Sequence, residues 1–396
     1  METFRNMAES SLSSLPDDIT INILARLPLI HLQRARSTCT AWNRLAAGPA
    51  FACLSTFQSS APASMPGFAL FISNDSTSQL FYLDLNDPSK WRSMPLSFLP
   101  NCGASLKLLA SSGGLLLLGT LSGDLLVANP VTRKWQKLPP MEAIQDPFYT
   151  ALMAESSTGN FTVAMAESEL RSNAATEIFE SKTGRWRAGA KPSRAGRWKR
   201  VASSMSTPWF YGSVPVFCKP VSCSGAFFHL TWDPEEMISE LDVKKGVWRC
   251  EKGNGAVPGG VPWGVMEDNG KVVMLEMSYS KGLVNAVGAL SSDATLSMWE
   301  LRQDQLKWVL TRRISPPPND KYHVDKWQRF ALGNGFLCTT FLVPGTIVTL
   351  ASHSDPQCGM IYDCAKASWS TMPDLPGTPW GSISSLFDFK ASLHPL

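Results

Sequence analysis

Histidine and cysteine are the side chains here that could support metal or nucleophilic chemistry, and both are sparsely placed. The nine cysteines include no C-x-x-C pair of the kind that zinc sites and redox motifs use. They are Cys39, Cys53, Cys102, Cys218, Cys223, Cys250, Cys338, Cys358 and Cys364. The five histidines, His31, His229, His323, His353 and His394, also lack the spacing of metal ligands. We therefore expect no metal, no cofactor and no catalysis by this chain alone.

Acidic pairs and glycine-rich loops point the same way. Asp17 and Asp18 open a helix, and Glu235 and Glu236 belong to a DPEE turn, so neither pair resembles an acid/base dyad. The glycine cluster at 253–260, GNGAVPGG, lacks the Gly-Lys-Ser/Thr ending of a phosphate loop and precedes a strand.

A basic stretch at 182–200, KTGRWRAGAKPSRAGRWKR, is the strongest charged feature of the sequence. It holds eight basic residues, no acidic ones and two tryptophans, and its candidate contact residues are Arg194, Arg197, Lys199 and Arg200. Such a stretch fits a nucleic acid, a nuclear import signal or an acidic or phosphorylated target. It also fits a solvated loop. We favour the loop, because the acidic residues Glu167, Glu169, Glu177 and Glu180 lie just upstream and could neutralise it.

A proline-rich stretch at 312–327, RRISPPPNDKYHVDKW, is a second candidate contact segment. It cannot form a continuous strand and is long for a hairpin. Because loops on a rigid scaffold often carry binding residues, we nominate Lys321 and Tyr322 as target-facing. An ordinary long connection explains the stretch equally well.

Composition limits the class of protein and its compartment. With 44% hydrophobic and 17% charged residues, the 396-residue chain can bury a large core, and a net charge of +3 demands no polyanionic partner. The opening METFRNMAESS has no apolar core of a secretory signal, and apolar runs such as Leu115 to Leu118 are too short to span a bilayer. Together with unpaired cysteines, this predicts a cytoplasmic or nuclear protein without a membrane partner.

Residues 13–45 have helical apolar spacing, unlike the rest of the chain. Ile19, Ile23 and Leu27 recur every fourth position and form one apolar stripe on a helix that begins near Pro16. Pro28 interrupts this helix, and further helical stretches follow before Gly48 and Pro49. Three helices in about fifty residues bury little surface, so we expect them to lean on something else.

The remainder of the chain repeats one layout six times: an alternating apolar strand, a polar turn, and a tryptophan that opens a second strand. The tryptophans lie 44, 51, 62, 60 and 61 residues apart. They are Trp91, Trp135, Trp186, Trp248, Trp308 and Trp369. Apolar strands led by glycine lie between several of these units, at 111–120, 223–232, 268–279 and 333–343.

This period is the size of a four-stranded propeller blade. We therefore predict a mainly β fold, a β-propeller of six or seven blades at 67–390, preceded by the helical unit at 12–54 and a Ser/Ala/Pro/Gly-rich linker at 55–66. Several unrelated β-sandwich domains would explain the strands, but not the recurring turn and tryptophan.

The order of residues in the helical unit resembles an F-box, and the whole chain resembles a plant F-box/kelch-repeat protein. The motif positions are Leu15, Pro16, Ile19, Ile23, Leu27, Pro28, Leu32, Arg36, Cys39 and Trp42. The kelch resemblance is the weaker part, because only Gly113-Gly114 and Gly259-Gly260 keep the double glycine of that repeat.

The resemblance implies a substrate receptor of an SCF-type ubiquitin ligase. In such a receptor the F-box docks a Skp-type adaptor, and through it a cullin, while the propeller captures an unknown target protein. The residues carried over as adaptor-facing or fold-forming are Leu15, Pro16, Ile19, Ile23, Leu27, Pro28, Leu32 and Trp42. Arg36 joins them either as an interface charge or as a solvated one.

Three other interpretations stay open at this point. The helical residues could instead form a core packed on the chain's own propeller. The chain could be a kelch-type scaffold or nucleic-acid-associated regulator that uses residues 182–200, although we do not expect a nucleic acid as partner. It could also be a propeller enzyme, which the histidine pattern disfavours.

Overall fold

The computed structural model describes residues within 15–51, 67–190, 221–314 and 337–389, with short gaps inside these ranges. Helices α2 (Asp17–Ala25), α3 (Leu29–Thr38) and α4 (Thr40–Ala46) come first and are called the helical module together with the residues up to 51. Strands β1 to β24 follow and form four-stranded antiparallel sheets.

Three sheets come from the first part of the chain and from its last strand. Sheet 1 consists of β24 (Ile383–Asp388), β1 (Gly67–Ser73), β2 (Ser78–Asp84) and β3 (Asp87–Met94). Sheet 2 consists of β4 (Leu106–Ser112), β5 (Leu115–Thr120), β6 (Leu125–Asn129) and β7 (Lys134–Lys137). Sheet 3 consists of β8 (Tyr149–Glu155), β9 (Asn160–Ala166), β10 (Thr176–Glu180) and β11 (Arg185–Ala188).

The other three sheets follow in chain order. Sheet 4 consists of β12 (Val221–Cys223), β13 (Ala226–Thr231), β14 (Met237–Asp242) and β15 (Val247–Lys252). Sheet 5 consists of β16 (Val261–Asp268), β17 (Lys271–Ser278), β18 (Thr295–Arg302) and β19 (Lys307–Ile314). Sheet 6 consists of β20 (Leu337–Val343), β21 (Thr346–Ser352), β22 (Gly359–Asp363) and β23 (Ser368–Thr371).

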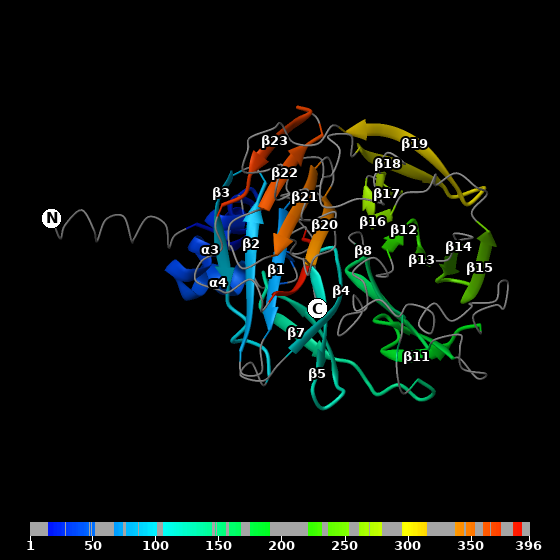
Figure 1. Cartoon of the computed structure of the whole chain (residues 1–396). Coiled ribbons are helices and arrows are strands. Elements are labelled where there is room, and N and C mark those ends of the chain that lie inside the picture. Colours follow the sequence, from blue (N-terminus) through cyan, green and yellow to red (C-terminus); the bar gives the residue numbers. More distant parts are fainter. Residues whose placement is uncertain are drawn as a thin grey trace, which may run out of the picture.

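The sheets are arranged around a common centre, as in a propeller (Figure 1). The first strand of each sheet contacts the first strand of the next, in the order β4, β8, β12, β16, β20, β24 and back to β4. Sheet 1 takes its first strand from the C-terminal part of the chain, because β24 pairs with β1. The expectation of a mainly β propeller preceded by a small helical unit is confirmed.

Strand β5 of sheet 2 is buried on both faces from Leu115 to Leu118, which explains its unbroken leucine run. Successive side chains of a strand point to opposite faces. Leu116 and Leu118 of β5 accordingly pack in the cluster shared with sheet 1, whereas Leu115 and Leu117 pack in the cluster shared with sheet 3. A strand buried on both sides therefore reads as continuously apolar rather than alternating.

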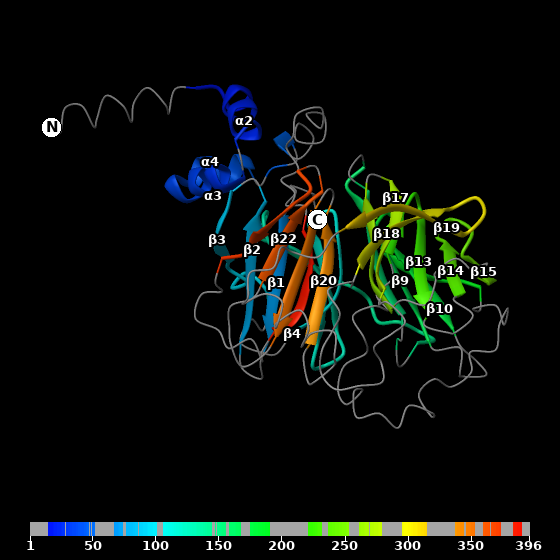
Figure 2. The ribbon, with the colours of Figure 1, turned by 45° about the horizontal axis from the view of Figure 1, so that its top comes forward.

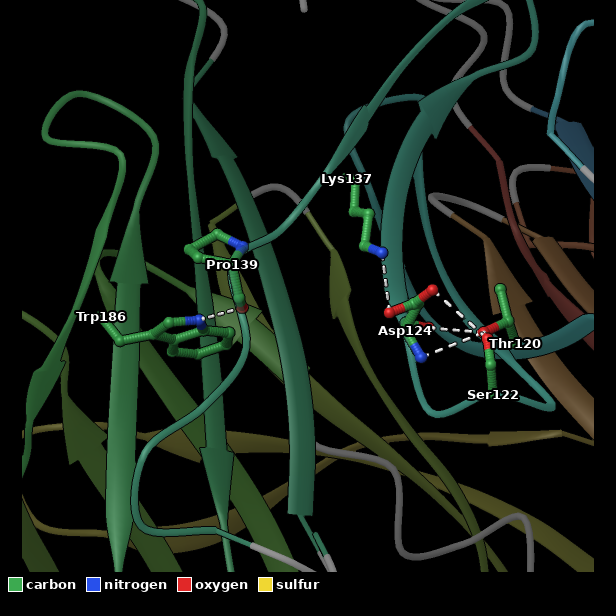
Figure 3. A network of polar contacts seen from close by, with 6 residues as sticks. All are labelled: Thr120, Ser122, Asp124, Lys137, Pro139 and Trp186. Carbon is green, nitrogen blue, oxygen red and sulfur yellow. Dashed lines mark hydrogen bonds and ion pairs between the residues drawn. The ribbon is translucent and has the colours of Figure 1, made fainter.

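Each of the six repeat tryptophans lies in the outermost strand of its sheet, as the turn-and-tryptophan layout predicted. Three of the indoles donate a hydrogen bond either to the preceding sheet in the ring or to the connection that leaves it. Trp186 Nε1 donates to the carbonyl of Pro139 at 2.8 Å (Figure 3), and Trp91 Nε1 to that of Pro373 at 3.0 Å. Trp248 Nε1 donates to Thr176 Oγ1 at 3.1 Å. The period thus marks contacts between neighbouring sheets.

The turn before the tryptophan also repeats its backbone geometry. The residue two positions before the tryptophan has a positive φ in sheets 2 to 6. These residues are Arg133 (φ 58°), Gly184 (φ 67°), Gly246 (φ 65°), Leu306 (φ 46°) and Ala367 (φ 51°). Only two of them are glycines, the residue that usually adopts a positive φ. The turn therefore keeps its geometry even where another residue replaces glycine.

The glycine-led segments correspond to more than one strand position, which the sequence did not indicate. Those at 111–120, 223–232 and 268–279 contain β5, β13 and β17, the second strands of their sheets, whereas the segment at 333–343 contains β20, a first strand. Gly113 (φ 55°), Gly225 (φ 82°) and Gly270 (φ 80°) share a positive φ, which favours glycine, and at Gly113 an added Cβ would also lie 2.7 Å from Ala154 Cβ. In the first three segments the glycine therefore lies in the tight turn before the second strand, and the glycines of the fourth lie outside the described residues.

We expect Trp186→Phe to lower the free energy of unfolding by about 1 kcal/mol, since the ring still packs on Phe179 but the donor to Pro139 is lost. Urea denaturation with an unchanged m value measures this. The matched control is Trp135→Phe. Trp135 is 41% exposed, so its replacement should change stability by less than about 0.5 kcal/mol. Equal losses in the two variants would contradict the assigned role of the bond between sheets.

Candidate partner-binding surface

Helix α2 begins directly after Pro16, as its sequence predicted. Pro16 is the N-terminal cap with φ −55° and ψ 146°, and its carbonyl accepts a hydrogen bond from the Thr20 amide at 3.0 Å. Asp17 and Asp18 lie in the first turn, where the helix dipole favours negative charge. The helix ends at Ala25, before Pro28, which lies outside the described residues.

The two apolar faces of α2 have different environments. Ile21 and Leu24 are 8% and 1% exposed and point into the helical module. Ile19 and Ile23 lie on the other face and are 44% and 48% exposed. The sequence stripe therefore exists, but its first two members face outward. Large aliphatic side chains in water are a surface that a partner could cover.

The helical module closes a core of its own. Its buried cluster consists of Ile21, Leu24, Leu32, Ala35, Ala46 and Phe51. Leu27 and Trp42 pack partly against this cluster, and the Trp42 amide donates to Cys39 Sγ at 3.3 Å, which satisfies a donor in the first turn of α4. Every residue of the cluster belongs to the module. Among the described residues, the module's hydrophobic core thus contains none from the sheets.

Arg36 joins the module to the propeller, which the sequence did not predict. Its Nη2 donates to the Thr132 carbonyl at 3.3 Å, its Nη1 donates to the Val131 carbonyl, and its Nε donates to Asn43 Oδ1 at 2.9 Å. Desolvation by burial, followed by the positive charge of Arg133, lowers the pKa of Arg36 from its usual value. Arg36 is therefore half-buried against the propeller and lies on α3, not on the outward face of α2. Spacing could not reveal this contact, because its partners lie about a hundred positions away.

Residues 12–53 match the F-box domain family. This segment is an F-box domain. The resemblance seen in the sequence is confirmed for this region, and the outward-facing Ile19 and Ile23 belong to it.

Two curated proteins of Arabidopsis thaliana are homologous to the chain. An F-box/kelch-repeat protein is 31% identical over 160 residues, which cover 39% of this chain and 36% of the relative. F-box only protein 13 is 28% identical over 186 residues, which cover 45% of this chain and 39% of the relative. The alignments thus span less than two fifths of the length of either relative.

Among solved structures, TolB from Acinetobacter baumannii aligns with 86% of this chain and 72% of its own, at a TM-score of 0.45 and 10% identity. A similarity of this size carries no argument about function.

The structure separates the residues that the sequence assigned to the adaptor. Pro16, Ile19 and Ile23 are exposed at the start and along the outer face of α2, and Leu15 beside them is half-buried. Leu32 is 3% exposed and belongs to the core of the F-box domain. Of the two roles that the resemblance implied, adaptor-facing or fold-forming, its burial favours the fold-forming one.

The residues nominated for a target lie outside the described part of the chain. These are Arg194, Arg197, Lys199, Arg200, Lys321 and Tyr322. Their segments connect the outermost strand of one sheet to the first strand of the next, β11 to β12 and β19 to β20. Their role stays a prediction.

Of the acidic residues expected to neutralise the basic stretch at 182–200, Glu177 has other partners, whereas Glu180 pairs with an arginine of that stretch. The buried Glu177 carboxylate accepts the backbone amides of Glu142 at 3.1 Å and of Ala143 and Ile144 at 3.2 Å. Glu180 pairs with Arg187 at 2.6 Å. Glu177 therefore stabilises the connection between sheets 2 and 3. Its carboxylate is less available to neutralise the basic side chains of residues 191–200.

Polar side chains also join on sheet 2, at the turn between β5 and β6 (Figure 3). Lys137 Nζ lies 2.9 Å from Asp124 Oδ1, and the hydrogen bond and positive charge of Lys137 lower the pKa of Asp124. The Asp124 amide donates to Thr120 Oγ1 at 3.0 Å. This exposed network closes the turn and has the form of a structural contact rather than a catalytic one.

Within the described ranges, no group of three or more His, Cys, Asp or Glu side chains has the arrangement of a metal site. The described helices are also each too short or too polar to cross a bilayer.

We expect Leu32→Ala to cost the F-box domain about 3 kcal/mol, because it opens a cavity in a small core. Ile23→Ala should change stability by less than about 0.5 kcal/mol, because Ile23 is about half exposed. Hydrogen exchange of α2 to α4 in the full chain reports the stability of this region. If Ile23→Ala accelerated exchange as much as Leu32→Ala, the division between the two faces would be wrong.

Proposed function

We propose that the chain is the substrate-recognition subunit of an SCF-type ubiquitin ligase. The F-box domain docks a Skp-type adaptor and, through it, a cullin. The propeller binds a target protein. The chain itself performs no chemistry and acts by holding the target beside the machinery that transfers ubiquitin, which raises the effective concentration of the target there.

The outward-facing isoleucines of α2 are the observation that carries this proposal. Two aliphatic side chains separated by one helical turn remain 44% and 48% exposed, although the module has a closed core beside them. Helix-in-groove recognition uses anchors with this spacing. The family match to residues 12–53 supports an adaptor as the partner that covers them.

We assign the contact to Ile19 and Ile23 first, with Leu15 and Pro16 at the start of the helix. Leu27 and Trp42 are half-buried against the module core, so they contribute whatever edge they leave exposed. Pro28 completes the set by its place in the motif. Pro16 also supplies the carbonyl that accepts the Thr20 amide, so its replacement would disturb the helix as well as the surface.

The target is proposed to contact loops of the propeller, including the nominated residues of 191–200 and 321–322. Loops on a rigid scaffold can change without disturbing the sheets that carry them. Electrostatic complementarity to the basic side chains would then favour an acidic target.

For the architecture we propose a six-bladed kelch-like propeller at 67–390, a linker at 55–66 and a helical unit at 12–54. The closed order of contacts among the first strands supports six blades. For the compartment we propose the cytoplasm or nucleus. The free thiols of Cys39, Cys223 and Cys364 support a reducing environment.

We expect the double variant Ile19→Ala, Ile23→Ala to weaken binding to a purified Skp-type adaptor about thirtyfold, since each half-exposed isoleucine contributes on the order of 1 kcal/mol when covered. Isothermal titration calorimetry with the full chain measures the affinity, and circular dichroism checks that α2 is intact.

The matched control removes equivalent side chains from the propeller. Val309 and Leu310 are each 37% exposed and belong to β19, a strand that lies far from α2 (Figure 2), so Val309→Ala, Leu310→Ala should leave adaptor affinity unchanged. If the α2 double variant bound the adaptor as tightly as the wild type does, the assigned surface would be wrong. Absence of any adaptor binding by the wild-type chain would refute the proposed function.

A further inference from the structure

The turn between β6 and β7 is built to receive a cation. Asn129 Oδ1 accepts the amides of Val131 at 2.9 Å and Thr132 at 3.2 Å, and its carbonyl accepts the Arg133 amide at 2.9 Å. The amides of the turn are thus satisfied internally. The carbonyls of the buried Val131 and Thr132 are left for the Arg36 guanidinium.

The same kind of contact recurs around the rim of the propeller. Arg187 of β11 donates to the Val243 carbonyl, Arg249 of β15 to the Gln303 carbonyl at 2.6 Å, and Arg312 of β19 to the Cys364 carbonyl at 2.6 Å. These acceptors lie five residues before the tryptophan of their sheet, and Val131 lies four before Trp135. Sheets 3, 4 and 5 thus each hold the following sheet by an arginine on its turn.

The F-box domain contacts sheet 2 as one sheet contacts the next, through an arginine that donates to carbonyls of the turn before the tryptophan. Arg36 makes the contact from α3, and its Nε is fixed by Asn43 of α4, so two helices orient the guanidinium. The buried hydrophobic cluster of the module ends within the module. This polar contact therefore constrains the orientation of the module without using its apolar surface.

We propose that Arg36 and the Val131–Thr132 turn form a rigid joint that fixes the adaptor-binding helix at one orientation to the propeller. Resting on the proposed function, the joint sets the distance and direction at which a bound target is presented for ubiquitin transfer. Arg36 is a positioning residue, and α2 makes the adaptor contact.

The test compares four variants of the full chain with the wild type. Arg36→Ala removes all three hydrogen bonds. Arg36→Lys keeps the charge and the aliphatic stem but lacks the planar fork, so it should restore the joint only in part. Asn129→Ala loosens the receiving turn from the propeller side. Arg133→Gly is the control, because it removes a like charge and a positive-φ side chain while leaving both acceptors in place.

For Arg36→Ala we expect hydrogen exchange in residues 129–134 to become about tenfold faster, as for loss of a charge-assisted hydrogen bond. Small-angle X-ray scattering should show a larger maximum dimension, and the adaptor affinity by calorimetry should stay within about twofold of the wild type. Asn129→Ala should reproduce the exchange and scattering changes, and Arg133→Gly should produce neither.

These outcomes separate the joint from the proposed function. Unchanged exchange and scattering in Arg36→Ala, with adaptor still bound, would overturn the joint and leave the function standing. An Arg36→Ala variant with weakened adaptor binding would also overturn it, because Arg36 would then be part of the adaptor contact. A wild-type chain that binds no adaptor would remove the function, while exchange and scattering would still decide whether the joint exists.

Discussion

The pairing of β24 with β1 is the interaction on which the ring depends. It joins strands more than 300 positions apart, with Ala69 opposite Phe387 and Leu70 opposite Leu386, and the Phe389 amide donates to the Gly67 carbonyl at 3.0 Å. Gly67 is required there, because a Cβ would lie 2.4 Å from the Tyr82 ring. Without this pairing sheet 1 would have an open edge and its core with sheet 2 would be exposed. Because the paired strands are so distant in sequence, we expect the ring to fold cooperatively and slowly.

Contacts at the rim explain how the ring forms without the regular double glycine of kelch repeats. Tryptophan donors and arginine donors connect neighbouring sheets at carbonyls, which any residue supplies. The turns that present these carbonyls tolerate Arg133, Leu306 and Ala367 at positive φ, at a cost of about 1 kcal/mol each. Side chains such as Asn129 and Asp363, which accept backbone amides inside the turn, offset that cost. The sheets therefore keep the turn geometry of the repeat even where the sequence has lost its glycines.

Strand layout could be predicted from the sequence because each sheet repeats the same local order of strand, turn and tryptophan. The direction of the α2 stripe could not, because a period of nearly four residues describes equally a face turned to the chain's own core and one turned to a partner. Ile21 and Leu24 fill the core, so Ile19 and Ile23 are displaced outward. The uses of Arg36 and Glu177 were also beyond the sequence. Both side chains bind backbone groups. Because every residue type has these groups, the sequence at the partner position does not reveal the contact.

A polar attachment of the F-box domain is consistent with keeping its apolar surface available. Packing the module on the propeller by a hydrophobic interface would need aliphatic side chains beyond the closed core, and Ile19 and Ile23 are the large ones left exposed on α2. An arginine that donates to carbonyls gives direction as well as attachment, because its planar fork must meet two acceptors at once. The cost is partial burial of a charge beside Arg133, and both effects lower the pKa of Arg36. The propeller thus fixes the module through α3, and the outer face of α2 stays open to a partner.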